Sequence, residues 1–161
     1  LSSSLAEAGD DVILVTAKGQ AIRFKESKLR LMGRGAGGVR GIRLRKGDVV
    51  VGADVVEKSS QNPALLVMGA HGYGKKTPLL EYKVQGRGGS GIKTARVTPK
   101  TGNIIVAKVV TDLMTEIISI SKQSQVIRVL LKEIPSSGRQ TQGVRIMRLR
   151  PNDSVATFVC Q

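Results

Sequence analysis

GRGAGGVRGIRL, residues 33–44, recurs twice more along the chain in altered form, as GRGGSGIKTARV at 86–97 and as GRQTQGVRIMRL at 138–149. Each copy reads Gly-Arg, three variable residues, Gly, an apolar residue, Arg or Lys, any residue, then apolar, Arg, apolar. We call this pattern the basic motif and number its positions 1 to 12. The copies start 53 and 52 residues apart, so the 161 residues hold three repeats of one unit. The approximate repeats are 1–53, 54–106 and 107–161.

The segments that flank each basic motif also recur, and they predict short β-strands. A turn candidate lies fourteen residues before each motif, at Gly19, Gly72 and Ser124. Runs rich in Val and Ile precede these turns and follow each motif, and Gly, Asn, Asp or Pro bound them. The apolar runs are Val12–Thr16, Leu65–Met68, Ile117–Ile120, Val49–Val56, Ile104–Val110 and Val155–Val159. We therefore predict an all-β chain of three propeller-like blades with about four strands each.

The positive charge is concentrated in the basic motifs. The chain has 26 Lys and Arg against 12 Asp and Glu, a net charge of +14. Half of these bases lie in residues 33–46, 86–100 and 138–150, which contain no acid, while the remaining residues carry a net charge near zero. If the charge served solubility alone, we would expect charged residues of both signs to be scattered along the sequence. One basic cluster per repeat instead favours a partner with regularly repeated negative charge.

The scarcity of aromatic residues narrows the choice of that partner. Only Phe24, Tyr73, Tyr82 and Phe158 are aromatic, whereas proteins that bind single-stranded nucleic acid stack bases on aromatic side chains. Duplex DNA held by its phosphates fits this composition, and bending around a curved array needs no reading of base sequence. An acidic protein and a structured RNA remain alternatives.

Several residues are of types found in cofactor, catalytic or metal sites but lack the neighbouring residues that such sites need. Gly33-x-Gly35-x-x-Gly38 has the dinucleotide spacing, yet an alternating, strand-like run follows it rather than a helix. His71 is a lone histidine in a turn, and the single cysteine, Cys160, cannot form an internal disulfide. We predict no active site, no metal site, no cofactor and no membrane span, and we expect a cytoplasmic location. The chain does not begin with Met, so we expect it to be part of a longer protein.

The residues 32–44, together with the preceding Val15–Phe24, closely resemble the C-terminal domain of the A subunit of bacterial DNA gyrase. The corresponding domain of the related topoisomerase IV is the alternative. This resemblance implies a β-pinwheel, a six-bladed propeller variant whose blades exchange strands, of which this chain would hold three blades. It also implies a non-catalytic, chromosome-associated domain that wraps duplex DNA and supports ATP-dependent supercoiling. The ATPase B subunit would be its partner together with the remainder of the A subunit, with ATP and Mg²⁺ acting elsewhere.

The family's first blade carries a Gln-Arg-Arg-Gly-Gly-Lys-Gly sequence, the gyrase box, and no segment of this chain matches it. The nearest strings are QGRGGSG at residues 85–91 and GRGAGG at residues 33–38. By position in the motif, the resemblance assigns DNA contacts to Arg34, Arg40, Arg43, Arg87, Lys93, Arg96, Arg139, Arg145 and Arg148. Strand alternation over 39–44, with a bulge near Gly41, predicts Ile42 and Leu44 on the inner face and the neighbouring arginines outside.

Overall fold

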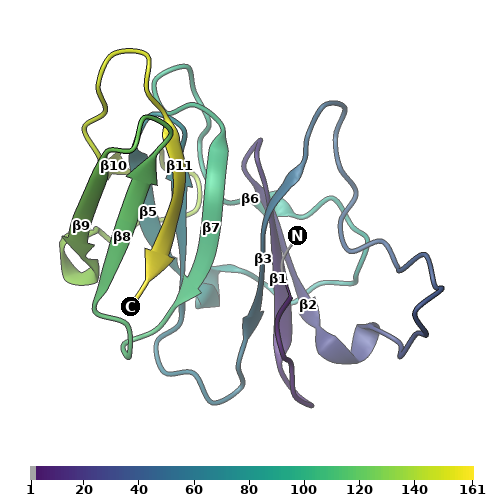
Figure 1. Cartoon of the computed structure of the whole chain (residues 1–161). Helices are drawn as coiled ribbons and strands as arrows, with labels where there is room; N and C mark the ends of the chain where they lie inside the picture. Colours follow the sequence, from purple (N-terminus) through teal and green to yellow (C-terminus); the bar gives the residue numbers. More distant parts are fainter. Residues whose placement is uncertain (1–2) are drawn as a thin grey trace.

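The chain is built from short antiparallel strands, as the computed structural model shows for residues 3–161 (Figure 1). The prediction of an all-β fold is confirmed: the described residues form strands, turns and three single 3-10 turns. The strands are β1 (Asp11–Thr16), β2 (Gln20–Lys25), β3 (Val50–Val56), β4 (Ala64–Gly69), β5 (Tyr73–Pro78), β6 (Ile92–Lys93), β7 (Ile104–Val110), β8 (Glu116–Ser121), β9 (Val126–Leu130), β10 (Val144–Arg145) and β11 (Val155–Cys160). The 3-10 turns are η1 (Glu26–Lys28), η2 (Leu79–Glu81) and η3 (Leu131–Glu133), each directly after a hairpin.

A hairpin is the centre of each blade: β1 with β2, β4 with β5, and β8 with β9. The predicted turns are confirmed, because Gly19, Gly72 and Ser124 all have positive φ, at 84°, 79° and 60°. Glycine adopts this conformation without steric cost, while Ser124 does so at some cost. A third strand, β3, β7 or β11, pairs antiparallel with the first strand of each hairpin.

The fourth strand of the first two sheets comes from the following repeat. Ile92 and Lys93 of β6 pair with Ala21 and Gln20 of β2, and β10 pairs in the same way with β5. The resulting sheet orders are β3-β1-β2-β6, β10-β5-β4-β7 and β11-β8-β9. Each of the first two sheets therefore depends on a segment about seventy residues further along the chain, and the third sheet has three strands.

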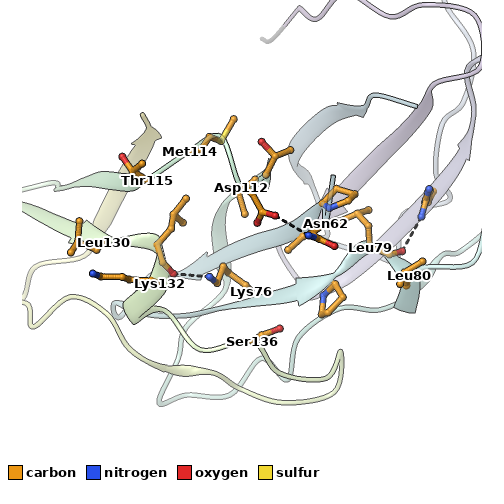
Figure 2. Close-up of a pocket in the computed structure, with 17 residues that line it drawn as sticks. Asn62, Lys76, Leu79, Leu80, Asp112, Met114, Thr115, Leu130, Lys132 and Ser136 are labelled. Carbon is orange, nitrogen blue, oxygen red and sulfur yellow. Dashed lines mark hydrogen bonds between the residues drawn. The ribbon is translucent and has the colours of Figure 1, made fainter. Parts of the chain in front are cut away.

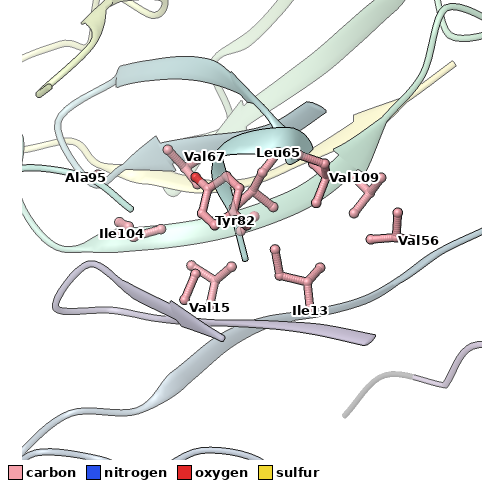
Figure 3. Packing of buried hydrophobic residues seen from close by; sticks show 12 residues of the cluster. Ile13, Val15, Val56, Leu65, Val67, Tyr82, Ala95, Ile104 and Val109 are labelled. Carbon is pink, nitrogen blue, oxygen red and sulfur yellow. The ribbon is translucent and has the colours of Figure 1, made fainter. Parts of the chain in front are cut away.

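The core lies between neighbouring sheets. Ile13 and Val15 of β1 face Leu65 and Val67 of β4, with the Tyr82 ring among them (Figure 3). Because successive residues of a strand point to opposite faces, Leu66 and Met68 of the same strand pack instead against the third sheet. The middle sheet is thus covered on both faces, which explains why β4 is apolar without interruption.

The second half of the basic motif differs from the predicted strand. Strand pairing there is confined to the two-residue β6 and β10, the residues 39–44 form no strand, and no register shift occurs at Gly41. This segment passes across the end of the neighbouring hairpin, so in the second and third repeats only the first two residues of the segment pair with a strand. Ile42 is nevertheless buried and Arg43 exposed, as expected, whereas Leu44 is 43% exposed, contrary to expectation.

Candidate nucleic-acid interface

A glycine at motif position 6 lets the second and third basic motifs lie close to the neighbouring strand. Gly91 has a φ of 69°, and a Cβ added there would lie 2.5 Å from the Ala21 carbonyl oxygen. Gly143 in the next repeat has a φ of 78° and presses against the Gly74 carbonyl in the same way. The main role of this glycine is therefore steric: it lets β6 and β10 join the preceding blade.

A buried residue at motif position 10 fixes the exposed arginine that follows it. Ile42, Ala95 and Met147 are all at most 6% exposed, so each motif is anchored in the core at this position. The next residue is an exposed arginine in every repeat: Arg43, Arg96 and Arg148. Position 8 is likewise basic and exposed in every repeat, at Arg40, Lys93 and Arg145. Six of the nine predicted contact residues thus present their charge to solvent from equivalent places.

Arg145 differs from the other position-8 side chains because an aromatic ring holds it. Its Nη2 donates a hydrogen bond to the Tyr73 hydroxyl at 2.9 Å. The guanidinium carbon also lies 5.3 Å from the centre of the Tyr73 ring, and Lys100 Nζ lies at the same distance. These cation–π contacts orient the two basic side chains beside one another.

The arginines at motif position 2 behave differently, because they contact the preceding repeat. Arg87 is half-buried; its Nε donates to the Lys28 carbonyl at 3.0 Å and its Nη1 to the Arg40 carbonyl at 2.7 Å. Arg139 is also half-buried; its Nη1 donates to the Lys93 carbonyl at 3.2 Å, and its backbone N–H to Glu81 Oε2 at 3.1 Å. Arg34, in the first repeat, is exposed.

Consecutive basic motifs are therefore in direct contact. Backbone hydrogen bonds extend these side-chain contacts: Arg43 N–H donates to the Gly89 carbonyl at 2.8 Å, and Arg96 N–H to the Thr141 carbonyl at 3.0 Å. Motif 1 contacts motif 2, and motif 2 contacts motif 3. The exposed arginines consequently lie along one continuous strip, which we call the basic strip and which contains the nine residues assigned from the sequence.

A hollow of about 520 Å³ lies on this strip where the first and second blades meet. Lys18 and Arg45 line it together with Lys93 and Arg139, and its lining contains no acidic residue. Sequence reasoning did not select Lys18 or Arg45 as contact residues. Lys18 stands directly before the Gly19 turn, and its counterparts His71 and Gln123 differ in type, so the repeat gave no signal there.

Acidic side chains instead pair with bases inside the blades. Asp11, almost fully buried, bonds Arg23 at 2.7 Å and Lys25 at 2.9 Å. Glu116 pairs with Arg128 at the equivalent place in the third blade. These pairs leave the excess charge to the basic strip.

Lys75, on β5, is a buried base next to the third motif. It is fully buried, and its Nζ donates to the Gly138 carbonyl at 2.5 Å. Burial lowers the pKa of Lys75 to about 8; Glu81 opposes this shift and Arg139 adds to it. The group holds the third motif against the second blade and does not face solvent.

An apolar pocket of about 860 Å³ occupies the opposite ends of the strands, between the second and third blades (Figure 2). Leu79, Leu80 and Met114 line it, and the Lys76 ammonium there donates to the Leu131 carbonyl at 2.6 Å. No group of three or more His, Cys, Asp or Glu suited to a metal ion occurs within residues 3–161. In the same part of the chain, no helix is long and apolar enough to cross a bilayer.

Comparison with known proteins agrees with this architecture. The family described as DNA gyrase C-terminal domain, beta-propeller, matches residues 10–57, 64–111 and 115–161. The A subunit of DNA gyrase from Staphylococcus epidermidis is 49% identical over 113 residues, and that from Staphylococcus aureus is 46% identical over the same length. These alignments cover 68% of this chain but only 12% and 13% of those proteins.

Solved structures show the same fold. The gyrase A C-terminal domain superposes with a TM-score of 0.86 at 30% identity, over 94% of this chain and 50% of that one. The C-terminal domain of DNA topoisomerase IV gives a TM-score of 0.88 at 25% identity, over 98% of this chain and 48% of that one. The three blades thus span about half of each solved domain. With its three matched repeats, the chain belongs to the DNA gyrase C-terminal domain family of β-propeller-like proteins.

Proposed function

We propose that this chain binds duplex DNA along the basic strip, without strong sequence preference, and bends the duplex around its blades. The observation that carries the proposal is the direct contact between consecutive basic motifs, which places exposed bases at equivalent positions on one path. A duplex carries one negative charge per ~1.7 Å of its axis, so a path of repeated positive sites is complementary to it.

The hollow between the first two blades adds a place where a phosphate group fits. Lys18, Arg45, Lys93 and Arg139 converge there without an acidic neighbour. Lys18 Nζ is already oriented by a 2.6 Å hydrogen bond to the Lys46 carbonyl. A basic side chain that is already ordered loses less conformational entropy when it binds, so this hollow is favoured as a strong phosphate contact.

Within a type IIA topoisomerase, such a domain would present bent DNA to the catalytic part of the holoenzyme and support ATP-dependent supercoiling. The partners we propose are duplex DNA, the remainder of the A subunit and the ATPase B subunit. The location we propose is the bacterial cytoplasm. The chain itself would perform no bond cleavage, and the proposed contacts need no cofactor. The proposal holds equally for a gyrase and for a topoisomerase IV, since both solved domains superpose on these blades.

A salt series of duplex affinities tests the proposal. Random-sequence duplexes of increasing length should bind with a log–log salt slope of about −5 to −8, and affinity should rise until the DNA spans all three blades. The triple variant Arg43→Ala, Arg96→Ala, Arg148→Ala should lower the slope by about 2.7, since each arginine releases about 0.9 counterions.

The matched control removes three exposed lysines that lie away from the basic strip. Lys58→Ala, Lys108→Ala, Lys132→Ala makes the same change in net charge and should leave the slope within about one unit of the wild type. Equal losses in both triple variants would refute the strip and leave only general charge attraction. A slope near zero in the wild type would favour the acidic-protein partner instead.

A further inference from the structure

A basic residue recurs at the same register on the second hairpin strand of every blade. It is Arg23 on β2, Lys76 on β5 and Arg128 on β9. In the first two blades this side chain also contacts the next blade: Arg23 Nη1 donates to the Leu79 carbonyl at 2.9 Å, and Lys76 Nζ donates to the Leu131 carbonyl at 2.6 Å. The three basic residues therefore hold equivalent positions.

The carboxylate that pairs with this basic residue is missing from the second blade. Asp11 at the start of β1 lies 2.7 Å from the base of its own blade, and Glu116 at the start of β8 pairs in the same way. Ala64 stands at this place in β4, and Lys76 forms no ion pair with an acid in residues 3–161. An ammonium group has three N–H donors, so Lys76 keeps two after its contact with the third blade.

A pocket opens where this carboxylate is missing. Ala64 and Lys76 both line the pocket of about 860 Å³ between the second and third blades (Figure 2). This volume lies in the range of ~300–1,000 Å³ that is typical of small-molecule sites. Leu79, Val110 and Leu131, all nearly fully buried, provide apolar walls. The pocket therefore places a cation beside an apolar surface.

The charges of the lining favour an anion. Arg23, Lys76 and Lys132 line the pocket, and Asp112 is the acid of the described lining. The Asp112 carboxylate accepts a hydrogen bond from Asn62 Nδ2 at 2.8 Å, and Arg23 is already paired within its own blade. Lys76, which is half-buried, and Lys132, which is exposed, remain for a bound anion.

We propose that this pocket binds a linear aliphatic carboxylate, with its carboxylate on Lys76 in the place that the acids of the first and third blades occupy. The alkyl chain would lie against Leu79 and Leu131 and would cover Leu80, which lines the pocket and is 95% exposed. Such a ligand combines an ion pair with the burial of apolar surface, whereas a small anion or an uncharged chain offers only one of these. The pocket lies at the strand ends opposite the basic strip, so this proposal does not depend on DNA binding.

Titration calorimetry with octanoate and decanoate tests the affinity. Decanoate should bind about fifteenfold more tightly than octanoate, because each buried CH₂ group tightens binding about fourfold. 1-Octanol has the chain without the charge and should bind about tenfold more weakly than octanoate, or weaker still.

NMR of methyl-labelled methionine locates the ligand. The Met114 signal should shift on addition of decanoate because Met114 lines the pocket, and the Met32 signal should stay unchanged because Met32 lies outside it. A shift at Met32 without one at Met114 would place the ligand elsewhere and overturn the proposal.

Two pairs of variants test the contact with Lys76. Ala64→Glu supplies the missing carboxylate from the chain and should weaken decanoate binding about tenfold or more, whereas Ala64→Gln, of similar size but uncharged, should weaken it less. Lys76→Met should weaken binding as strongly as Ala64→Glu, and Lys58→Met, which makes the same charge change outside the pocket, should not. Thermal unfolding checks that each variant is folded, and the Ala64 pair decides the question if Lys76→Met does not fold.

Three results would overturn the proposal. The first is that neither octanoate nor decanoate binds the wild type. The second is that Ala64→Glu and Ala64→Gln have equal effects, which would mean that space alone matters. The third is that duplex DNA displaces decanoate, which would place the ligand on the basic strip.

Discussion

Replacing Arg87 by alanine should reduce the stability of the fold, whereas replacing Arg96 should reduce DNA binding. Both residues belong to the second basic motif, and both are equally basic in the sequence. Arg87 is half-buried and donates to two backbone carbonyls of the first repeat, while Arg96 is exposed. The pair therefore distinguishes a structural arginine of the motif from one that we propose contacts DNA.

The size of the stability effect follows from the two hydrogen bonds. A hydrogen bond from a charged group contributes about 1.5–3 kcal/mol, and the lower end suits a half-buried guanidinium. Arg87→Ala should therefore lower the free energy of unfolding by about 2–3 kcal/mol. For a chain of this length, that corresponds to a fall in Tm of about 4–12 °C. Arg87→Lys keeps one ammonium nitrogen in place of the forked guanidinium, so it retains one of the two contacts and should lose about half as much.

Thermal unfolding and a duplex salt series, measured on the same variants, provide the assay. Arg96→Ala should change the unfolding free energy by less than about 0.5 kcal/mol and lower the salt slope by about 0.9. Arg87→Ala should keep most of the wild-type slope at a temperature where it is folded. The reasoning is refuted if Arg87→Ala has the wild-type Tm and loses as much salt slope as Arg96→Ala.

Three further predictions concern Lys75, Cys160 and Gly91. The pKa of Lys75 is about 8 in the folded chain and 10.5 in the unfolded chain, so between these pH values the unfolded chain binds one proton more. The free energy of unfolding should therefore rise with pH in this range, by up to about 3 kcal/mol relative to Lys75→Met, as followed by urea unfolding. Burial raises the pKa of Cys160 to about 11, so iodoacetamide should alkylate the native thiol about a hundredfold more slowly at pH 8 than the urea-unfolded thiol, and equal rates would contradict this. Gly91→Ala should cost at least about 2 kcal/mol in denaturant titrations, because its Cβ would lie 2.5 Å from the Ala21 carbonyl, whereas Gly37→Ala should be neutral because that site is open.

The repeat made much of the fold predictable. Three copies of one pattern located the Gly19 turn and its two counterparts, and apolar runs such as Ile104–Val110 coincide with strands. The exposure of the basic residues at motif positions 8 and 11, on either side of the buried residue at position 10, was also predicted. Their role in DNA binding stays a prediction.

What the sequence could not reveal depends on contacts between repeats. Two residues such as Ile92 and Lys93 carry too little periodicity to identify a ladder partner seventy residues away. Arg87 looks like any other arginine of the motif until the Arg40 carbonyl is placed beside it. Alternation over 39–44 failed for the same reason, since the segment follows the surface of a neighbouring hairpin rather than a continuous strand.

The exchange of strands between blades also has a consequence on the ribosome. The first sheet is complete only when Lys93 has emerged to pair with Gln20. At a translation rate of about 5–20 residues per second, the intervening chain takes about 4–15 s to synthesise. During that interval the β2 edge of a nascent chain is open, and the Ile92–Lys93 segment of a neighbouring nascent chain has the right sequence to fill it. Crowded polysomes would therefore favour mispairing between neighbouring nascent chains, first at the β2 edge and then at the β5 edge, because the first blade is synthesised before the second.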